Sequence, residues 1–299
     1  ILDPRAARRA GSGALPLLFN VEVARVDAPL TVQSRPEPMA LVIQERVREN
    51  GGVRVGVYRG RAPSADEGWI RWLFDQYRFG YESLSEAELR QSGIAARFDA
   101  IILPDQTMVE LERALAGGQD RRTTAPPDMA ESGGDAALRS LRNFVESGGT
   151  LITFNQASFF IARQFRLPVR SVSAEPLDRR AKGRMSILRL EVDPADPLSL
   201  GIGGESIACY ENGPVFEVLD PQVARVVARY PARGAKSLLL YGSLPGQISL
   251  AGRAALVEVK VGRGRVILFG FRPLYRGRSL ATFPFIFNSL MTSGRTDRQ

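Results

Sequence analysis

The 299-residue chain has the composition of an ordinary globular protein, with 44% hydrophobic and 24% charged residues, which excludes a wholly disordered chain. Its formal net charge of +8 comes mostly from scattered arginines and not from one basic face. We therefore expect a solvated Arg-rich surface, with polyanion binding as a minor alternative and nucleic acid not expected as a partner. No window approaches the ~20 apolar residues of a membrane-spanning helix, so no membrane span is expected.

Histidine is absent from the chain, and cysteine occurs once, at Cys209. Ser-His-Asp and Cys-His relays, zinc sites with imidazole ligands and an internal disulfide are therefore excluded. Acid–base chemistry would depend on carboxylates, lysine or tyrosine. Cys209 has no neighbouring base and is interpreted as a small, partly buried residue. We assign no catalytic residue, no metal ligand and no cofactor from the sequence.

Residues 1–50 are expected to form an N-terminal arm and linker. The segment from Arg5 to Gly13 is basic and built of small residues, and the prolines of Arg35-Pro36-Glu37-Pro38 favour extended backbone. A short helix is predicted over Met39–Asn50, ended by two glycines. Because the chain begins at Ile1 and not at Met, we expect any secretory signal to lie outside it.

Residues 51–299 are expected to form one α/β domain. Strands alternate with helices through the first part of this domain, which predicts a mainly parallel, doubly wound sheet with right-handed crossovers. The expected strands are Val53–Tyr58, Tyr81–Leu84, Phe98–Leu103 and Thr150–Phe154, and the expected helices are Ala65–Arg78, a helix from Ser85, and Asp135–Ser147.

The second part of the domain is richer in strand candidates. The clearest hairpin runs from Ala254 to Phe271 and turns at Gly262-Arg263-Gly264, and it is expected to add antiparallel strands to the sheet. Gln119–Gly134 is rich in Gly, Pro and Asp and is predicted to be an exposed insertion. The other expected elements are strands over Ile187–Val192, Val215–Leu219, Ala224–Tyr230 and Ser237–Tyr241, and a helix over Ser279–Ser293.

One stretch, FVESGGTLITFNQASFF from Phe144 to Phe160, is typical of an active-site scaffold. A helix ends at two glycines, a buried strand follows, and the chain then turns sharply into a second helix. Open α/β sheets place a nucleophile or ligand loop at such a turn. Here the turn carries Asn155 and Gln156, so the scaffold is expected without its nucleophile.

Four segments together resemble a known family: DEGWIRW, FDAIILPDQ, FVESGGTLITFNQAS and ALVEVKVGRGRVILFGFRPLYR. They are similar to the class I glutamine-amidotransferase-like domain at the C-terminus of certain bacterial zinc carboxypeptidase-like proteins. The resemblance implies a flavodoxin-like fold for residues 51–299. It also implies an upstream peptidase domain and a periplasmic or extracellular location.

The sequence departs from this family's active members. Working amidotransferase domains need a Cys at the strand-to-helix turn and a His–Glu pair, and the peptidase needs two His and one Glu. None of these sets is present, so glutaminase and zinc carboxypeptidase activity are both expected to be absent. The chain would then be the non-catalytic portion of such a protein.

Polar residues gather after the predicted strands, where the carboxyl ends of parallel strands would bring them to one crevice. They are equally typical of turns and helix caps. A stacking role for Trp69 is an alternative to core packing. The candidate ligand-binding residues are Tyr58, Arg59, Asp66, Glu67, Trp69, Asp105, Gln106, Asn155, Gln156, Ser158, Arg272 and Arg276.

Two functional classes follow from these residues. In the first, the chain is a binding or interaction module for a small polar ligand (a sugar, a peptide or an amino acid), or for the upstream peptidase domain or another protein. Arg272 or Arg276 would then pair with a ligand carboxylate. The alternative is a carboxylate- or metal-dependent hydrolase acting at Asp66 and Asp105.

Overall fold

The structure, a computed structural model, describes residue 17 and residues 52–91, 93–116, 136–172, 185–232, 237–242 and 250–293. The predicted arm and linker over residues 1–50, residue 17 apart, and the predicted insertion Gln119–Gly134 lie outside the described residues. No helix among the described residues is long and apolar enough to span a membrane.

Five strands form the parallel half of the sheet, in the order β2-β1-β3-β4-β12. Val55 of β1 lies opposite Ala100 of β3, which confirms the predicted parallel pairing of these two strands. This order corresponds to the 2-1-3-4-5 order of flavodoxin-like sheets. The strands are β1 (Val55–Arg59), β2 (Glu82–Ser85), β3 (Ala100–Leu103), β4 (Thr150–Phe154) and β12 (Gly264–Phe269).

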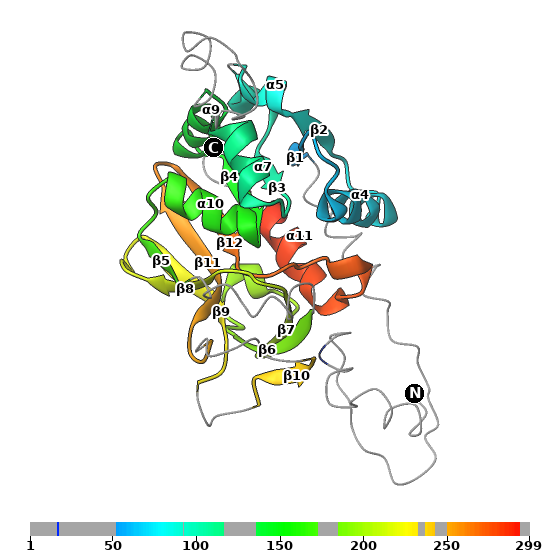
Figure 1. The fold of residues 1–299 in the computed structure, drawn as a ribbon, viewed down its shortest axis with the longest axis vertical. Coiled ribbons are helices and arrows are strands. Elements are labelled where there is room, and N and C mark those ends of the chain that lie inside the picture. Colours follow the sequence, from blue (N-terminus) through cyan, green and yellow to red (C-terminus); the bar gives the residue numbers. More distant parts are fainter. Residues whose placement is uncertain are drawn as a thin grey trace.

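The sheet continues beyond β12 as an antiparallel half, so it is mixed (Figure 1). The predicted hairpin is present as β11 and β12. The antiparallel half is larger than the hairpin alone, because β9, β6 and β10 follow β11 and three further strands pair at its side. Its strands are β5 (Val169–Val172), β6 (Ser186–Val192), β7 (Glu205–Tyr210), β8 (Val215–Val218), β9 (Ala224–Arg229), β10 (Leu239–Tyr241) and β11 (Ala254–Val261).

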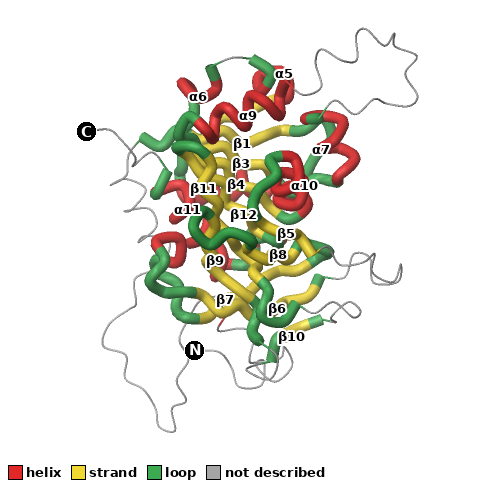
Figure 2. The backbone as a smooth tube through the Cα atoms, turned by 90° about the vertical axis from the view of Figure 1, so that its left-hand side faces the viewer, coloured by secondary structure: helices red, strands yellow, loops and turns green. Residues whose placement is uncertain are grey.

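Helices cover both faces of the parallel half (Figure 2). One face packs against α4 (Ala65–Tyr77) and α11 (Phe283–Met291) through one buried cluster. The other face packs against a second cluster that five helices share. These helices are α5 (Glu86–Leu89), α6 (Ile94–Arg97), α7 (Met108–Leu115), α9 (Ala136–Glu146) and α10 (Gln156–Gln164). Short 3-10 helices occur at Pro197–Ser199, Tyr275–Gly277 and Leu280–Thr282.

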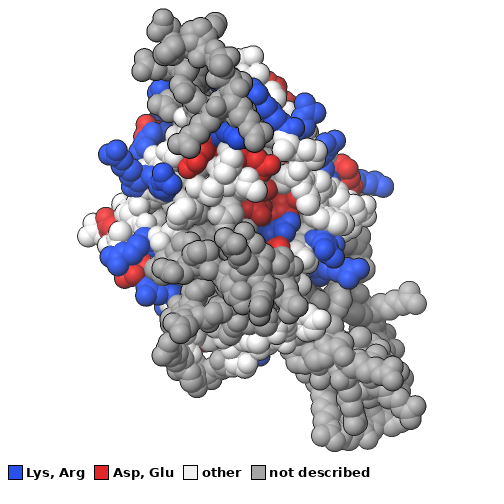
Figure 3. Space-filling view, in the orientation of Figure 1, with Lys and Arg blue, Asp and Glu red and all other residues white. Residues whose placement is uncertain are grey.

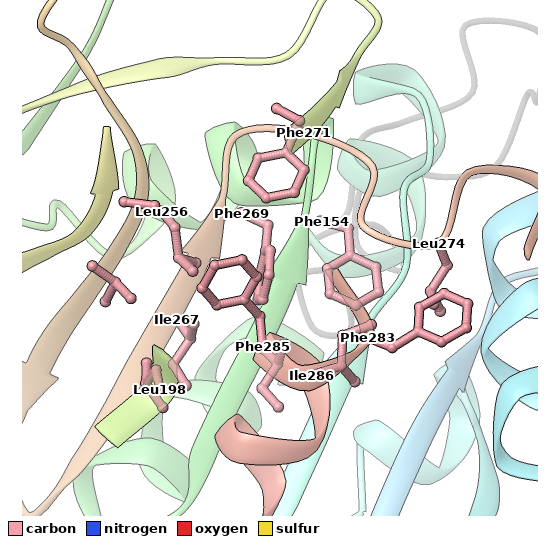
Figure 4. Close-up of a cluster of buried hydrophobic side chains, with 14 of the residues drawn as sticks. Phe154, Leu198, Leu256, Ile267, Phe269, Phe271, Leu274, Phe283, Phe285 and Ile286 are labelled. Carbon is pink, nitrogen blue, oxygen red and sulfur yellow. The ribbon is translucent and has the colours of Figure 1, made fainter. Parts of the chain in front are cut away.

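Aromatic side chains fix the carboxyl ends of β4 and β12 (Figure 4). Phe154 packs edge-on against Phe269, with 5.2 Å between ring centroids, and Phe269 packs edge-on against Phe271 at 5.6 Å. All three side chains are fully buried. Edge-to-face aromatic pairs stabilise such a cluster by about 0.5–1.5 kcal/mol each beyond the burial of their area. The loops that leave these two strands therefore start from tightly packed strand ends.

The start of α4 follows from its sequence. Ser64 is the N-cap, and its hydroxyl accepts a hydrogen bond from the backbone N–H of Glu67. Asp66 and Glu67 occupy the first turn, where the helix dipole favours negative charge. Both are buried; Asp66 contacts Arg272 in the segment after β12, and Glu67 lines a cavity together with Arg59 at the end of β1. The cap thus places two carboxylates at the carboxyl ends of the parallel strands.

Candidate functional site

A cavity of about 320 Å³ opens at the carboxyl ends of the parallel strands. The segments after β1, β3, β4 and β12 all contribute to it, and it lies at the point where the chain leaves β1 and β3 in opposite directions across the sheet. Open α/β sheets bind their ligands at this place. The lining residues of this crevice are Ala62, Pro63, Ser64, Ala65, Asp105, Gln106, Thr107, Glu110, Gln156 and Arg272.

Asn155 sits on a strained turn between β4 and α10. Its φ is 50° and its ψ is −114°, a conformation that costs a residue with a side chain about 1–3 kcal/mol. The sharp strand-to-helix turn predicted from the sequence is therefore present, and its geometry is that of a nucleophile elbow. The residue at its tip carries an amide, and its Nδ2 donates to Oδ2 of Asp105 at 3.1 Å. The backbone N–H of Gln156 donates to the other carboxylate oxygen at 3.0 Å.

The guanidinium of Arg272 is surrounded by carboxylates. It contacts Asp66 through two nitrogens, with Nη2 at 2.6 Å from Oδ1 and Nε at 3.0 Å from Oδ2. Nη1 donates to Glu211 at 2.7 Å, and Nε lies 3.8 Å from Asp105. The cluster of Asp66, Asp105, Glu211 and Arg272, which we call the acidic cluster, therefore holds three carboxylates and one guanidinium. Figure 3 shows acidic side chains next to basic ones near the centre of this face.

Burial, together with this excess of negative charge, changes the protonation of the site. Burial and, after it, the nearby carboxylate of Asp66 together raise the pKa of Asp105 to about 6, and the hydrogen bonds from Gln156 and Asn155 oppose the shift. Burial also raises the pKa of Asp66, although the hydrogen bonds and charge of Arg272 oppose the shift. Burial by itself lowers the pKa of Arg272. The hydrogen bonds of Arg272 to Asp66 and the surrounding carboxylates outweigh this effect and raise the pKa overall.

The structure brings half of the predicted site residues together. Six of the twelve either line the crevice or form a hydrogen bond with a residue that lines it. These six come from four separate segments of the chain. The sequence-based expectation that polar residues after the strands converge therefore describes these six. They are Asp66, Asp105, Gln106, Asn155, Gln156 and Arg272.

Four predicted residues have other roles. Tyr58 is fully buried in the second cluster, because helices cover both faces of β1, and burial raises its pKa to about 12. Ser158 is fully buried, and its hydroxyl bonds to the carbonyls of Thr153 and Phe269. Trp69 packs on the core and against the edge of Trp72. These three therefore serve packing, and neither described cavity includes them.

Arg276 also lies away from the crevice. It is exposed on the 3-10 helix after β12, and its guanidinium stacks on the ring of Tyr275 at 5.3 Å from the centroid. Arg59 and Glu67, the remaining two candidates, line a second cavity of about 520 Å³ beside the crevice. The twelve candidates thus divide between the crevice, the second cavity, the core and the surface.

The contacts of Arg272 bear on the expected pairing of its guanidinium with a ligand carboxylate, which stays a prediction. Its three nitrogens already donate to Asp66 and Glu211, so an incoming carboxylate would meet two carboxylates at the same guanidinium. Arg272 is better described as the residue that neutralises and positions the acids. Losing it would leave Asp66, whose exposed fraction is 2%, buried without a counter-charge.

Glu211 is the cluster member that the sequence did not predict. It follows β7, a strand whose short run IACY was not assigned, and it reaches Arg272 from the antiparallel half of the sheet. The neighbouring loop must pass very close to the elbow. A Cβ on Gly213 would lie 2.0 Å from the carbonyl oxygen of Gly270 and 2.5 Å from Oδ1 of Asn155, so only glycine fits there.

The three carboxylates are not arranged as a metal site. In the described part of the chain, no group of three or more His, Cys, Asp or Glu side chains has the geometry to hold a metal ion. Arg272 occupies the space between Asp66 and Glu211 where a cation would have to sit. The position between Asp66 and Glu211 is therefore already filled by the guanidinium of Arg272.

The sequence matches no family model and no curated protein. Among solved structures, it is similar to a proposed GMP synthase component from Thermoplasma acidophilum (12% identity, 80% of this chain, 92% of that chain, TM-score 0.48). A glutamine amidotransferase from Thermotoga maritima is similar at 10% identity, 80% and 94% coverage and a TM-score of 0.43.

A β-galactosidase from Bacillus circulans sp. alkalophilus is similar at 12% identity and a TM-score of 0.44. The likeness covers 80% of this chain, which spans 30% of the length of that enzyme. At TM-scores below 0.5, these likenesses establish neither a family nor an activity. What the chain does must therefore be inferred from its own residues.

Proposed function

We propose that the chain is a non-catalytic, amidotransferase-like binding module whose crevice holds a small polar ligand that is neutral or cationic. The acidic cluster supports this most directly, because it holds one buried and two half-buried carboxylates around one guanidinium at the edge of the sheet where such folds bind ligands. Such an imbalance is unfavourable in the free protein and is relieved by a ligand that brings hydrogen-bond donors or positive charge.

The polar atoms in the wall of the crevice suit a hydroxyl-rich ligand such as a sugar. Asp105 presents a partly exposed carboxylate, whose lone pairs accept from hydroxyl or ammonium groups. Nε2 of Gln106 is buried and has no hydrogen-bond partner among the described residues, so it can donate to a ligand oxygen. Of the sugar, peptide and amino-acid ligands considered from the sequence, the sugar best fits these atoms.

The absence of catalysis in this proposal follows from the elbow and the composition. Asn155 provides no nucleophile at the turn, and the chain has no histidine to serve as its base. The segments quoted above support a place for this module beside a zinc carboxypeptidase-like domain in a periplasmic or extracellular protein. Sequencing the reading frame upstream of Ile1 tests that part of the proposal, since a peptidase domain must precede it there.

The binding role is tested with three sugars that differ mainly in charge: glucose, glucosamine and glucuronate. Calorimetric titration of the purified chain at pH 7.5 should give the tightest binding for glucosamine and the weakest for glucuronate. Asp105→Asn should weaken glucosamine binding about tenfold or more, as expected for loss of one charge-assisted hydrogen bond. Asp220→Asn, on a turn after β8 and outside the crevice lining, is the matched control. The proposal would be contradicted if glucuronate bound most tightly or if none of the three sugars bound.

One observation favours a second candidate function, acid–base hydrolysis at Asp105. A carboxyl with a pKa of about 6 is close to the range in which general acids and bases operate at neutral pH. In that case the chain should hydrolyse p-nitrophenyl glycosides with a rate that changes near pH 6. The activity should disappear in Asp105→Asn and persist in Asp220→Asn.

A further inference from the structure

The second cavity differs from the crevice in its charge. It lies between the carboxyl ends of β1 and β2, has a volume of about 520 Å³ and shares only Pro63 with the crevice lining. This volume is in the range of sites that enclose small organic ligands. Its charged lining residues are Arg59, Arg61, Arg71, Arg90, Glu67 and Glu86.

The negative and positive side chains of this cavity differ in how deeply they are buried. Glu67 and Glu86 are each 6% exposed, whereas the side chain of Arg61 is 83% exposed. Glu86 is fully engaged, because Nε of Arg61 donates to one oxygen at 2.9 Å and Arg90 donates to the other. The cavity therefore has buried carboxylates in its wall and guanidinium groups at its mouth.

In the wall of this cavity, Glu67 has one buried oxygen that accepts no hydrogen bond from the described residues. Its Oε1 has no hydrogen-bond partner among the described residues, and the nearest cation, Nη1 of Arg71, is 3.6 Å away. A buried acceptor without a donor destabilises the free protein, so this oxygen favours a ligand that supplies an N–H or O–H.

Two arginines at the mouth can bind an anionic group. Arg61 uses Nε for Glu86, which leaves the two terminal nitrogens of its guanidinium directed away from that contact. Arg59 is exposed at the end of β1 and forms no ion pair with any residue in the described ranges. Guanidinium groups bind carboxylates through paired hydrogen bonds, which a lone ammonium cannot do.

We propose that this cavity binds a small zwitterion, an amino acid or a short peptide, with its ammonium group on Glu67 and its carboxylate on Arg59 and Arg61. A simple anion would leave the Glu67 oxygen unsatisfied and would be repelled by it. A simple cation would meet four arginines against two glutamates. A molecule with both charges satisfies both parts of the cavity, and this site is independent of the sugar site proposed for the crevice.

Three peptides of equal length test the proposal by calorimetric titration of the full chain: triglycine, N-acetyltriglycine and triglycinamide. The first carries both charges, the second lacks the ammonium and the third lacks the carboxylate. Triglycine should bind about tenfold or more tighter than either blocked form. Glu67→Gln should remove the advantage of triglycine over N-acetyltriglycine, and Arg59→Gln should remove its advantage over triglycinamide.

Arg229→Gln, on an exposed strand position, and Asp105→Asn, in the crevice, should leave all three affinities unchanged. Equal binding of the three peptides, or no binding of triglycine, would overturn the proposal. Because Arg59 is exposed and belongs to no buried cluster, Arg59→Gln keeps the test decisive even where Glu67→Gln lowers stability. A triglycine site abolished by Asp105→Asn would also overturn it, since binding would then belong to the crevice.

Discussion

The two ends of the parallel strands each hold a cluster of charged side chains, and the clusters differ in their balance of positive and negative charge. At the amino-terminal end, Glu258 accepts from Arg225 at 3.0 Å and from Arg265 at 3.3 Å, and Arg225 also contacts Asp196 at 3.0 Å. This basal cluster has two carboxylates for two guanidiniums. At the carboxyl end, the acidic cluster has three carboxylates for one guanidinium.

The difference separates a structural role from a binding role. In the basal cluster, Arg265 also donates to the hydroxyls of Thr150 and Thr292, so it joins β4, β11, β12 and α11. Burial lowers the pKa of Arg265, although the nearby negative charge of Glu258 acts in the opposite direction. The basal cluster lines neither described cavity. A balanced, closed network needs no further partner, whereas the acidic cluster borders a cavity and carries surplus charge.

Removing the cation from the acidic cluster should have the largest effect. Arg272→Met leaves Asp66 and Glu211 without a counter-charge, and breaking a buried pair in this way costs about 3–5 kcal/mol of stability. Urea denaturation at pH 7 measures the loss. Arg276→Met, on the exposed neighbouring arginine, is the control and should change stability little. A loss below about 1 kcal/mol for Arg272→Met would mean that the carboxylates are already neutral.

The pH dependence of stability should come next in size. Because the pKa of Asp105 rises from 3.8 to about 6 on folding, the fold favours the protonated carboxyl. The resulting stabilisation is complete below about pH 3.8 and is lost as the pH rises through about 6. The shift corresponds to about 3 kcal/mol for this largely buried group.

Asp105→Asn should therefore flatten the curve of unfolding free energy against pH between pH 4 and 6.5. Denaturant titrations of both proteins across this range measure the difference. Parallel curves for the two proteins would show that Asp105 titrates normally. The basal cluster offers the control, because Glu258→Gln should leave this part of the curve in place.

Glu258→Gln should have a smaller effect on stability at pH 7. The change removes the charge that Arg225 and Arg265 share but keeps an oxygen acceptor, so we expect a loss of about 1.5–3 kcal/mol. Sugar binding in the crevice should not change. An equal loss of glucosamine affinity in Glu258→Gln and Asp105→Asn would remove the distinction between the two clusters.

The sequence predicted the parallel half of the sheet and six residues of the crevice for one physical reason. Strands of continuous apolar character such as β3 and β4 are recognisable locally, and parallel pairing then brings their carboxyl ends to one edge. The helix α7 was missed although Thr107 and Glu110 form a capping box at its start. That signal was present in the sequence and would have located the helix.

Other features depend on tertiary structure that local patterns do not encode. Glu211 joins the acidic cluster because β7 pairs with β6, and neither the pairing nor the strand is visible in the run IACY. Tyr58 is buried at the end of β1 because helices cover both faces of this strand. The engagement of Arg272 by two carboxylates depends on segments that are 61 and 206 residues away in the chain.

The last prediction concerns the turn between β4 and α10, where we expect a substitution to create no catalytic activity. Asn155→Cys places a thiol on the strained turn, where a working amidotransferase domain carries its nucleophile. The chain has no histidine to accept the proton, and the adjacent carboxylates of the acidic cluster disfavour a thiolate. We therefore expect the introduced thiol to titrate above the usual ~8.5 and to be a few per cent ionised or less at pH 7.

Thiolate absorbance against pH measures this directly, with Asn143→Cys on an exposed position of α9 as the reference thiol. The native Cys209 does not interfere, because burial raises its pKa to about 12. Glutamine hydrolysis should be absent from both variants. A thiolate at Asn155→Cys below pH 7, or release of ammonia from glutamine, would show that the elbow keeps an electrostatic environment suited to a nucleophile. The surplus negative charge at this end of the sheet predicts the opposite, because the field that favours a cationic or hydroxyl-rich ligand also opposes a thiolate.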